Sequence, residues 1–385
     1  MAKNPNYFYA RGLGTFRILQ LTPSVGSWQD VGYIKSCVLT ITPEMLDIID
    51  DTGAIRNVLR VSKKGEINTT LMQSSKEEVD LIVDADGKQY AVQYFGEVAD
   101  GGVFQYFLAH RTKITPKLDL AFQSGSERIV PLQASVIDLT DELGYAVPLV
   151  MVFQGAALMY PEYAGLWIDP VSGKNLGTVK VLDISGYGRH GSLNVSTLWT
   201  TGTPANFLRF DGTDDSVDFG NVLNDDGTAD FAIEGWVRVQ GADASVQEIL
   251  TKKSVITGNT AGYSIHRSAA NKLVFTLGSG SANVAVTSAA NVLQNVWKHF
   301  RVSVDRNGNA TMYLNGVADG TPASVAALGT GTNALSLYLG RDGTNFGQAD
   351  IGGVMISVYG AGALPSTDAA IALAHYNAQK TIFGL

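Results

Sequence analysis

Residues 231–239 read Phe-Ala-Ile-Glu-Gly-Trp-Val-Arg-Val, and this stretch decides the fold class. Apolar and polar or bulky side chains alternate along it, which predicts a β-strand with two different faces. One face carries Phe231, Ile233, Val237 and Val239, and the opposite face carries Glu234, Trp236 and Arg238. We therefore expect a strand whose first face packs on a core.

Similar short runs continue on both sides of this strand. We expect further strands at 207–210, 263–267, 273–277, 299–304, 311–314, 335–339 and 354–359. Asn307-Gly308 and Asn315-Gly316 stand between such runs and predict hairpin turns. Eight or more short strands are typical of a β-sandwich or jelly roll. Ser366-Thr367-Asp368 followed by an alanine-rich stretch to about Lys380 predicts a closing helix.

The region before these strands also reads as mainly β. Strands are expected at 35–42, 59–73, 89–96, 103–112, 117–123, 128–139 and 145–153. Thr42-Pro43-Glu44 predicts a short helix through Ile49, because a helix favours a capping Thr and an early Pro. Ser75-Lys76-Glu77-Glu78 matches a capping box and predicts a second short helix ending before Asp84. The chain is thus expected to be all-β, with a sandwich or barrel domain over 1–157 and a jelly roll over 158–385.

Composition limits the function classes. The chain has 385 residues, and 28 basic against 36 acidic side chains give a net charge of −8, which argues against a surface that grips nucleic acid. Cys37 is the single cysteine, and it is expected to act as a small core residue. The first residues contain no apolar segment, and no apolar run approaches the ~20 residues of a membrane span. We expect folding in a bacterial cytoplasm and no membrane insertion.

A search for catalytic patterns finds none with the right context. The glycine-rich stretch Gly186–Gly191 is followed by a strand-like segment, whereas a dinucleotide site needs a helix there. The five histidines are far apart in sequence, and no Gly-x-Ser-x-Gly elbow occurs. Glu234 has no acidic partner two residues away on its strand, as a glycosidase would favour. We expect no enzyme and no organic cofactor, and we expect the tryptophans to be core residues.

One acidic stretch has the composition of a cation site. Asp211-Gly212-Thr213-Asp214-Asp215 offers carboxylates on a glycine-containing loop, which suits Ca²⁺. The candidate ligands are Asp183, Asp211, Asp214 and Asp215. The alternative is that these aspartates stand in turns and accept backbone hydrogen bonds.

The second region resembles a laminin-G or concanavalin A-like jelly roll over about residues 158–382. The resemblance rests on segments in a fixed order, which are Asp183–Gly186, Gly191–Leu193, Leu208–Val217, Phe231–Val237, Trp297–His299, Met312–Gly316 and Leu339–Arg341. In the family a late segment often carries an aspartate after Ile-Gly or Ile-Asp. Here that segment reads Ile351-Gly352-Gly353-Val354, so one oxygen ligand of the family's calcium site is missing.

The first region resembles, more loosely, the tail tube (major tail) protein of long-tailed bacteriophages. The resemblance rests on Trp28–Gly32, Ser36–Glu44 and the segment from Gly65 to Val83. It implies a domain that assembles into stacked, usually hexameric rings around a negative lumen through which DNA passes without specific binding. Candidates for the acidic lining are Glu66, Glu77, Glu78 and Asp80. An ordinary solvated charged face is the alternative.

Together these resemblances predict a structural virion protein. The first domain would form the tail tube, and the second would decorate its exterior and bind host-surface carbohydrate. The implied partners are further copies of this chain and the tape measure, tail terminator and distal tail proteins. The alternative is a carbohydrate-binding adhesin in which the laminin-G-like domain is the main functional unit. A third interpretation, a glycosidase dependent on Glu234 or Asp215, is expected to show no activity.

Overall fold

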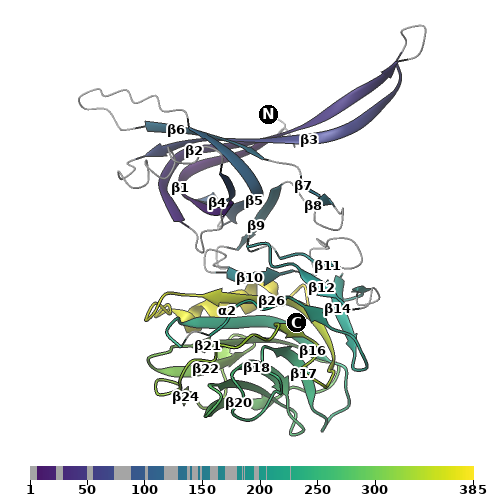
Figure 1. The fold of residues 1–385 in the computed structure, drawn as a ribbon, viewed down its shortest axis with the longest axis vertical. Helices are drawn as coiled ribbons and strands as arrows, with labels where there is room; N and C mark the ends of the chain where they lie inside the picture. Colours follow the sequence, from purple (N-terminus) through teal and green to yellow (C-terminus); the bar gives the residue numbers. More distant parts are fainter. Residues whose placement is uncertain are drawn as a thin grey trace. The chain divides into compact units, whose positions relative to one another are not determined.

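The computed structural model (Figure 1) describes residues 7–22, 29–49, 55–72, 88–99, 103–116, 129–136, 139–140, 146–147, 150–156, 164–169, 180–183, 185, 187–194, 199–204, 206–225 and 227–385. The chain divides into two compact units, Met1–Ala157 and Leu158–Leu385.

The first domain is built around one antiparallel sheet. Its strands are β1 (Tyr7–Thr22), β2 (Gln29–Ile49), β3 (Ile55–Met72), β4 (Gln89–Ala99), β5 (Val103–Pro116), β6 (Ile129–Val136) and β9 (Val150–Ala156). They pair in the order β4-β1-β2-β3-β6-β5-β9, and a further β4–β5 pairing joins six of them into a closed ring. The short strands β7 (Leu139–Thr140) and β8 (Ala146–Val147) pair with each other.

The short helix predicted from Thr42 to Ile49 is wrong, because these residues continue strand β2. They pair with β3 from Thr42 opposite Lys64 to Ile49 opposite Ile55. The partner strand satisfies backbone groups that a helix would otherwise satisfy internally. Pro43 is tolerated because β2 pairs with β1 only as far as Thr40, and proline is confined to strand edges of this kind. The second predicted helix and the predicted strand at 117–123 lie outside the described residues.

The second domain contains two large antiparallel sheets. In the first, which we call the β16 sheet, neighbouring strands pair in the order β13 (Trp199–Thr201), β14 (Asn206–Asp211), β26 (Gln348–Val358), β16 (Phe231–Val239), β21 (Trp297–Val304), β22 (Asn309–Leu314) and β23 (Val317–Ala318). Strand β10 (Ala164–Ile168) also pairs with β26, and β24 (Ala323–Ser324) also pairs with β22. In the second, which we call the β18 sheet, neighbouring strands pair in the order β11 (Lys180–Val181), β12 (Gly191–Leu193), β15 (Val217–Asp218), β25 (Tyr338–Leu339), β17 (Gln247–Thr251), β18 (Gly262–Arg267), β19 (Lys272–Gly278) and β20 (Asn283–Asn291). A continuous apolar core draws side chains from both sheets, which confirms the predicted jelly-roll-like fold.

Strand β16 has one face on this core, as its alternation predicts. Phe231, Ile233, Val237 and Val239 all belong to the core cluster. The opposite face is also covered, and Trp236 is only 2% exposed. Helix α2 (Asp368–Gln379) and the residues after it lie over that face, so the predicted closing helix is confirmed.

The two asparagine–glycine turns differ in geometry. Asn315 and Gly316 both have positive φ angles, 49° and 79°, as a two-residue hairpin turn requires. The β21–β22 hairpin instead has a four-residue loop in which Gly308 N–H donates to the Asp305 carbonyl at 3.0 Å.

Strand β12 begins at Gly191, where a dinucleotide site would need a helix. Within the described part of the chain, no helix is long and apolar enough to span a membrane.

Candidate functional site

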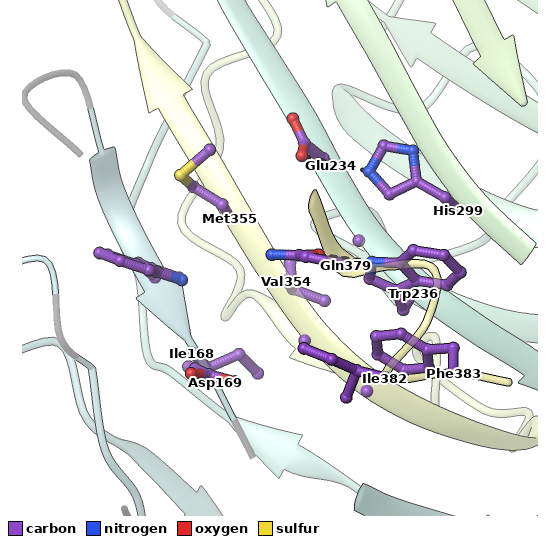
Figure 2. A pocket seen from close by; sticks show the side chains of 14 residues that line it. Ile168, Asp169, Glu234, Trp236, His299, Val354, Met355, Gln379, Ile382 and Phe383 are labelled. Carbon is purple, nitrogen blue, oxygen red and sulfur yellow. Dashed lines mark hydrogen bonds and ion pairs between the residues drawn. The ribbon is translucent and has the colours of Figure 1, made fainter. Parts of the chain in front are cut away.

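A cavity of about 260 Å³ lies on the outer face of the β16 sheet. Strands β10, β16, β21 and β26 and the end of the chain contribute to it. Figure 2 shows Glu234 and His299 at one end, and Ile382 and Phe383 at the other. The described residues that line it are Trp167, Ile168, Asp169, Glu234, Gly235, Trp236, His299, Gly352, Gly353, Val354, Met355, Gln379, Ile382 and Phe383.

Glycines make room for this cavity and for the segment that closes it. A Cβ atom at Gly352 would stand 2.3 Å from the Phe383 ring, so the phenyl ring occupies space that any other residue would fill. At Gly353 a Cβ atom would meet only the Ile168 carbonyl oxygen, at 3.3 Å. The Ile351-Gly352-Gly353-Val354 segment therefore shapes a hollow surface on β26.

Aromatic rings form the apolar part of the site. The rings of Trp236 and Phe383 are stacked with centroids 4.0 Å apart, and Trp297 meets Phe383 edge-on at 5.0 Å. The Trp236 indole N–H donates to Gln379 Oε1 at 2.5 Å. Trp167, Trp236 and Trp297 are buried, as expected for core tryptophans, and Trp199 is half-buried and packs against the core. Trp28 lies outside the described residues. Two of the three buried tryptophans, Trp167 and Trp236, also line the cavity.

The polar end of the cavity is a buried cluster that we call the Glu234 network, made of Glu234, His299, Arg301, Asp368 and His375. Glu234 Oε1 lies 3.2 Å from His299 Nε2 and 2.6 Å from His375 Nδ1. Arg301 Nη1 donates to Glu234 Oε2 at 2.7 Å. Burial alone would raise the pKa of Glu234, but His375, His299 and Arg301 outweigh it and hold that pKa well below its usual range. The carboxylate is therefore ionised although it is buried.

Arg301 extends the network to helix α2. Its Nη2 donates to Asp368 Oδ1 at 2.6 Å, and Ser303 Oγ donates to Asp368 Oδ2 at 2.5 Å. Desolvation works against the charged guanidinium, but Glu234, Tyr359 and Asp368 raise its pKa above the usual value. Strands β16 and β21 and helix α2 are thus joined by charged groups that compensate one another.

The sequence pattern does not point to Glu234, because this residue has no acidic partner on its own strand. Its partners come instead from β21 and α2, and Arg301 stands directly opposite Glu234 in the β16–β21 register. The alternation of His299, Arg301 and Ser303 on the non-core face of β21 was a signal that could have found the network. No comparable pattern in the sequence points to His375, which lies 141 residues away from Glu234 along the chain.

The predicted calcium ligands separate into two groups. Asp211, Asp214 and Asp215 each offer an oxygen within 4.8 Å of the others. Asp183 is buried and not part of that group; its carboxylate accepts hydrogen bonds from the N–H groups of Trp167, Ser185 and Arg189 and from Ser185 Oγ. Four donors occupy its lone pairs, so Asp183 holds Trp167 in place at the cavity. The other three carboxylates are a donor set that suits calcium.

The acidic loop also has the turn geometry of the alternative interpretation. Asp215 Oδ2 accepts from Asp211 N–H at 2.9 Å, and Asp211 Oδ1 accepts from Thr213 N–H at 2.7 Å. Burial and the charges of Asp211 and Asp214 raise the pKa of Asp215, partly offset by the hydrogen bond from Asp211. A bound cation would relieve the repulsion among these carboxylates, and calcium here stays a prediction.

Of the predicted lumen residues, only Glu66 lies in the described part of the chain. It is half-buried on β3, where it pairs with Thr40 of β2 and Ser135 of β6. Glu77, Glu78 and Asp80 lie outside the described residues.

Comparisons with known proteins concern the second domain's fold. Residues 211–359 match the family model of the concanavalin A-like lectin/glucanases superfamily. The chain therefore contains a laminin-G or concanavalin A-like domain, and the match covers β15 to the end of β26. No curated protein matches the sequence.

Solved structures with partial likeness include clostridial toxin binding domains. The binding domain of Paraclostridial Mosquitocidal Protein 1 is 16% identical, with a TM-score of 0.43 and coverage of 57% of this chain and 53% of that one. The botulinum neurotoxin serotype D binding domain is 13% identical, with a TM-score of 0.44 and coverage of 57% and 51%. A botulinum neurotoxin serotype D ligand binding domain in complex with N-acetylneuraminic acid is 13% identical, with a TM-score of 0.44 and coverage of 57% of this chain and 52% of that one. The chain spans about half the length of each.

Proposed function

We propose that the second domain is a carbohydrate-binding module and that its binding site is the cavity beside Glu234. The observation that carries this proposal is a cavity that combines buried aromatic rings with carboxylate, imidazole and amide groups, in a domain that matches a lectin-containing superfamily. Ligand sites combine an apolar lining with a few placed polar groups in this way. This function corresponds to an adhesin-like role for the protein.

We propose binding without hydrolysis. A glycosidase needs a carboxylic acid whose raised pKa lets it protonate the leaving oxygen. Glu234 is the buried carboxyl at the cavity, and its pKa is held low by the partners described above. Asp215, the other residue considered for catalysis, belongs to the acidic loop and does not line the cavity. Both observations favour recognition over catalysis.

The test uses the full chain on a glycan array, followed by titration calorimetry with the glycans that bind. A Gly353→Val variant should lose at least tenfold in affinity, because the added side chain enters the cavity from a residue whose φ is not positive. Val317→Ala is the matched control, since Val317 is 63% exposed on β23 and does not line the cavity. An array with no bound glycan, or equal affinity for wild type and Gly353→Val, would exclude this site.

A second function is favoured by a specific feature of the first domain. From Thr42 to Ile49, strand β2 pairs only with residues 55–64 of β3, so a two-stranded ribbon extends beyond the sheet with both edges unpaired among the described strands (Figure 1). Unpaired edges are templates for strand addition, and an isolated two-stranded ribbon is marginally stable in water. We propose that copies of this chain pair along the ribbon, as a tail tube would require.

Electron microscopy of the purified protein tests the assembly. A tube-forming domain should give rings or hollow filaments in negative stain, and replacing residues 45–60 by a short Gly-Ser turn should abolish them. Far-UV circular dichroism of that variant would verify that the remaining sheet is folded. A wild-type protein that stays monomeric at high concentration in analytical ultracentrifugation would rule out the tube and leave the carbohydrate proposal intact.

A further inference from the structure

The formal charges on the described side chains that line the cavity have one sign. Among the described residues that line it, the formally charged side chains are the carboxylates of Asp169 and Glu234, and none is lysine or arginine. His299 is the remaining titratable group of the lining, and its Nε2 is already at hydrogen-bond distance from Glu234. A ligand that enters the cavity therefore meets two acidic groups.

Arg301, the cation of the Glu234 network, is not available to a ligand. Arg301 is 1% exposed, and its guanidinium donates to Glu234, to Asp368 and to the Tyr359 hydroxyl. Turning it toward the cavity would leave the buried carboxylates of Glu234 and Asp368 without their guanidinium partner, which is strongly destabilising. Arg301 does not line the cavity either. Its positive charge is used inside the protein.

Recognition of an acidic sugar needs the opposite arrangement. A carboxylate, sulfate or phosphate group is bound by arginine, lysine or an array of backbone N–H groups. Asp169 and the Glu234 network, in which Glu234 and Asp368 share the guanidinium of Arg301, repel such an anion, and the low dielectric constant of a partly closed cavity strengthens this repulsion. Carboxylates do, however, accept hydrogen bonds from hydroxyl groups, and apolar rings pack against the C–H faces of a sugar.

Resting on the proposed function, we infer that the cavity binds one uncharged saccharide unit, whose hydroxyl groups donate to Asp169 and Glu234, and that it rejects acidic sugars. The volume of about 260 Å³ suits a single unit, because pockets for larger ligands span roughly 300–1,000 Å³. Gln379 and the rings of Trp236 and Phe383 complete the wall (Figure 2).

The experiment compares matched pairs of oligosaccharides with the full chain, each pair sharing a neutral core and differing by one sialic acid or sulfate group. We expect the neutral member to bind at least tenfold more tightly than the acidic one. Asp169→Asn removes one negative charge from the lining and keeps the size of the side chain. It should reduce the ratio of the neutral to the acidic affinity severalfold. Asp305→Asn, in the β21–β22 loop away from the lining, is the control and should leave the ratio unchanged.

Each outcome has a distinct meaning. Acidic glycans that bind as tightly as neutral ones, and that lose binding in Gly353→Val, would overturn this inference while supporting carbohydrate binding in the cavity. An unchanged ratio in Asp169→Asn would also overturn the role of the acidic lining. Absence of binding to every glycan would remove the proposed function itself, and the inference with it.

Discussion

Glu234 is a residue whose role depends on what surrounds it. A buried carboxylate normally loses its charge, because burial penalises the ionised form. Here two imidazoles and a guanidinium lie at 2.6–3.2 Å and stabilise the anion. The same side chain lines the cavity and contacts His375 of helix α2, so the proposed binding site and the position of the helix depend on one group.

Breaking the Glu234 network at Arg301 should be costly. Arg301→Ala leaves Glu234 and Asp368 buried without their main cation, and we expect a loss of about 3–5 kcal/mol in the free energy of unfolding. Urea denaturation followed by tryptophan fluorescence measures it. Arg209→Ala is the control: its side chain is 45% exposed, Asp350 keeps Arg238 and Gln240 as partners, and the expected loss is under about 1 kcal/mol. Equal losses in the two variants would contradict this account.

His266 should make stability depend on pH. Burial and the charge of Lys253 lower its pKa to about 4, although Asp342 acts in the opposite direction. Between about pH 6.5 and pH 4, the imidazole of His266 is protonated in the unfolded chain but not in the folded chain. The contribution of His266 to the free energy of unfolding is therefore fully present above about pH 6.5 and is lost as the pH falls toward about 4. The loss between pH 7 and 4.5 should be about 2–3 kcal/mol. His266→Gln should flatten that part of the urea denaturation profile, and an unchanged pH slope in the variant would show that His266 is not its source.

The acidic loop gives a prediction about metal. If Asp211, Asp214 and Asp215 hold calcium, millimolar CaCl₂ should raise the melting temperature, because a ligand that binds only the folded state stabilises it. Asp215→Asn should abolish the shift, and excess EDTA should reverse it. Equal melting curves with calcium and with EDTA would leave the turn interpretation, in which the carboxylates accept backbone hydrogen bonds.

Helix α2 is the element that turns a sheet face into a site. The α2 residues Ile371, Ala372 and His375 are buried, and Phe383, which follows the helix in the chain, stacks on Trp236. The alanine-rich sequence predicts a helix but not its position. Asp368 contributes through Arg301 and Ser303, while the N-cap residue Thr367 makes no side-chain cap hydrogen bond. Tertiary contacts, more than helix capping, hold this element.

Removing the aromatic anchor should loosen that element locally. Phe383→Ala deletes a buried ring, which typically costs about 3–5 kcal/mol, and we expect faster amide hydrogen exchange in 368–383 than in strands β16 and β21. Leu373→Ala, at a position of α2 that is 45% exposed, is the matched control and should leave exchange nearly unchanged. Slow exchange of α2 in Phe383→Ala would mean that the ring does not hold the helix.

At the scale of the whole molecule, each sheet of described strands lies within one of the two units. Two separate calorimetric transitions are therefore expected, since each unit has its own hydrogen-bonded framework. Arg301→Ala should lower the melting temperature of one transition, and a bound saccharide should raise that same transition. A single transition that shifts as a whole in both experiments would show that the units unfold together.

The ribbon formed by residues 42–49 and 55–64 shows where local signals were insufficient. Thr42-Pro43-Glu44 is a good helix start, and the apolar residues that follow fit a short helix equally well. The pairing partner, residues 55–64, decides for a strand, because it supplies hydrogen bonds along the whole segment. Short apolar runs are ambiguous in this way until their partner is known.

What the sequence determined by itself was local. The alternation in 231–239, the positive-φ turn at Asn315-Gly316 and the alanine-rich end each follow from the periodicity or conformational preference of adjacent residues, and the jelly-roll-like fold follows from their order. Only the tertiary structure decided the site. Glu234 meets Arg301 and His375 across 67 and 141 residues, and such contacts depend on strand register and helix docking, which no stretch of neighbouring residues encodes.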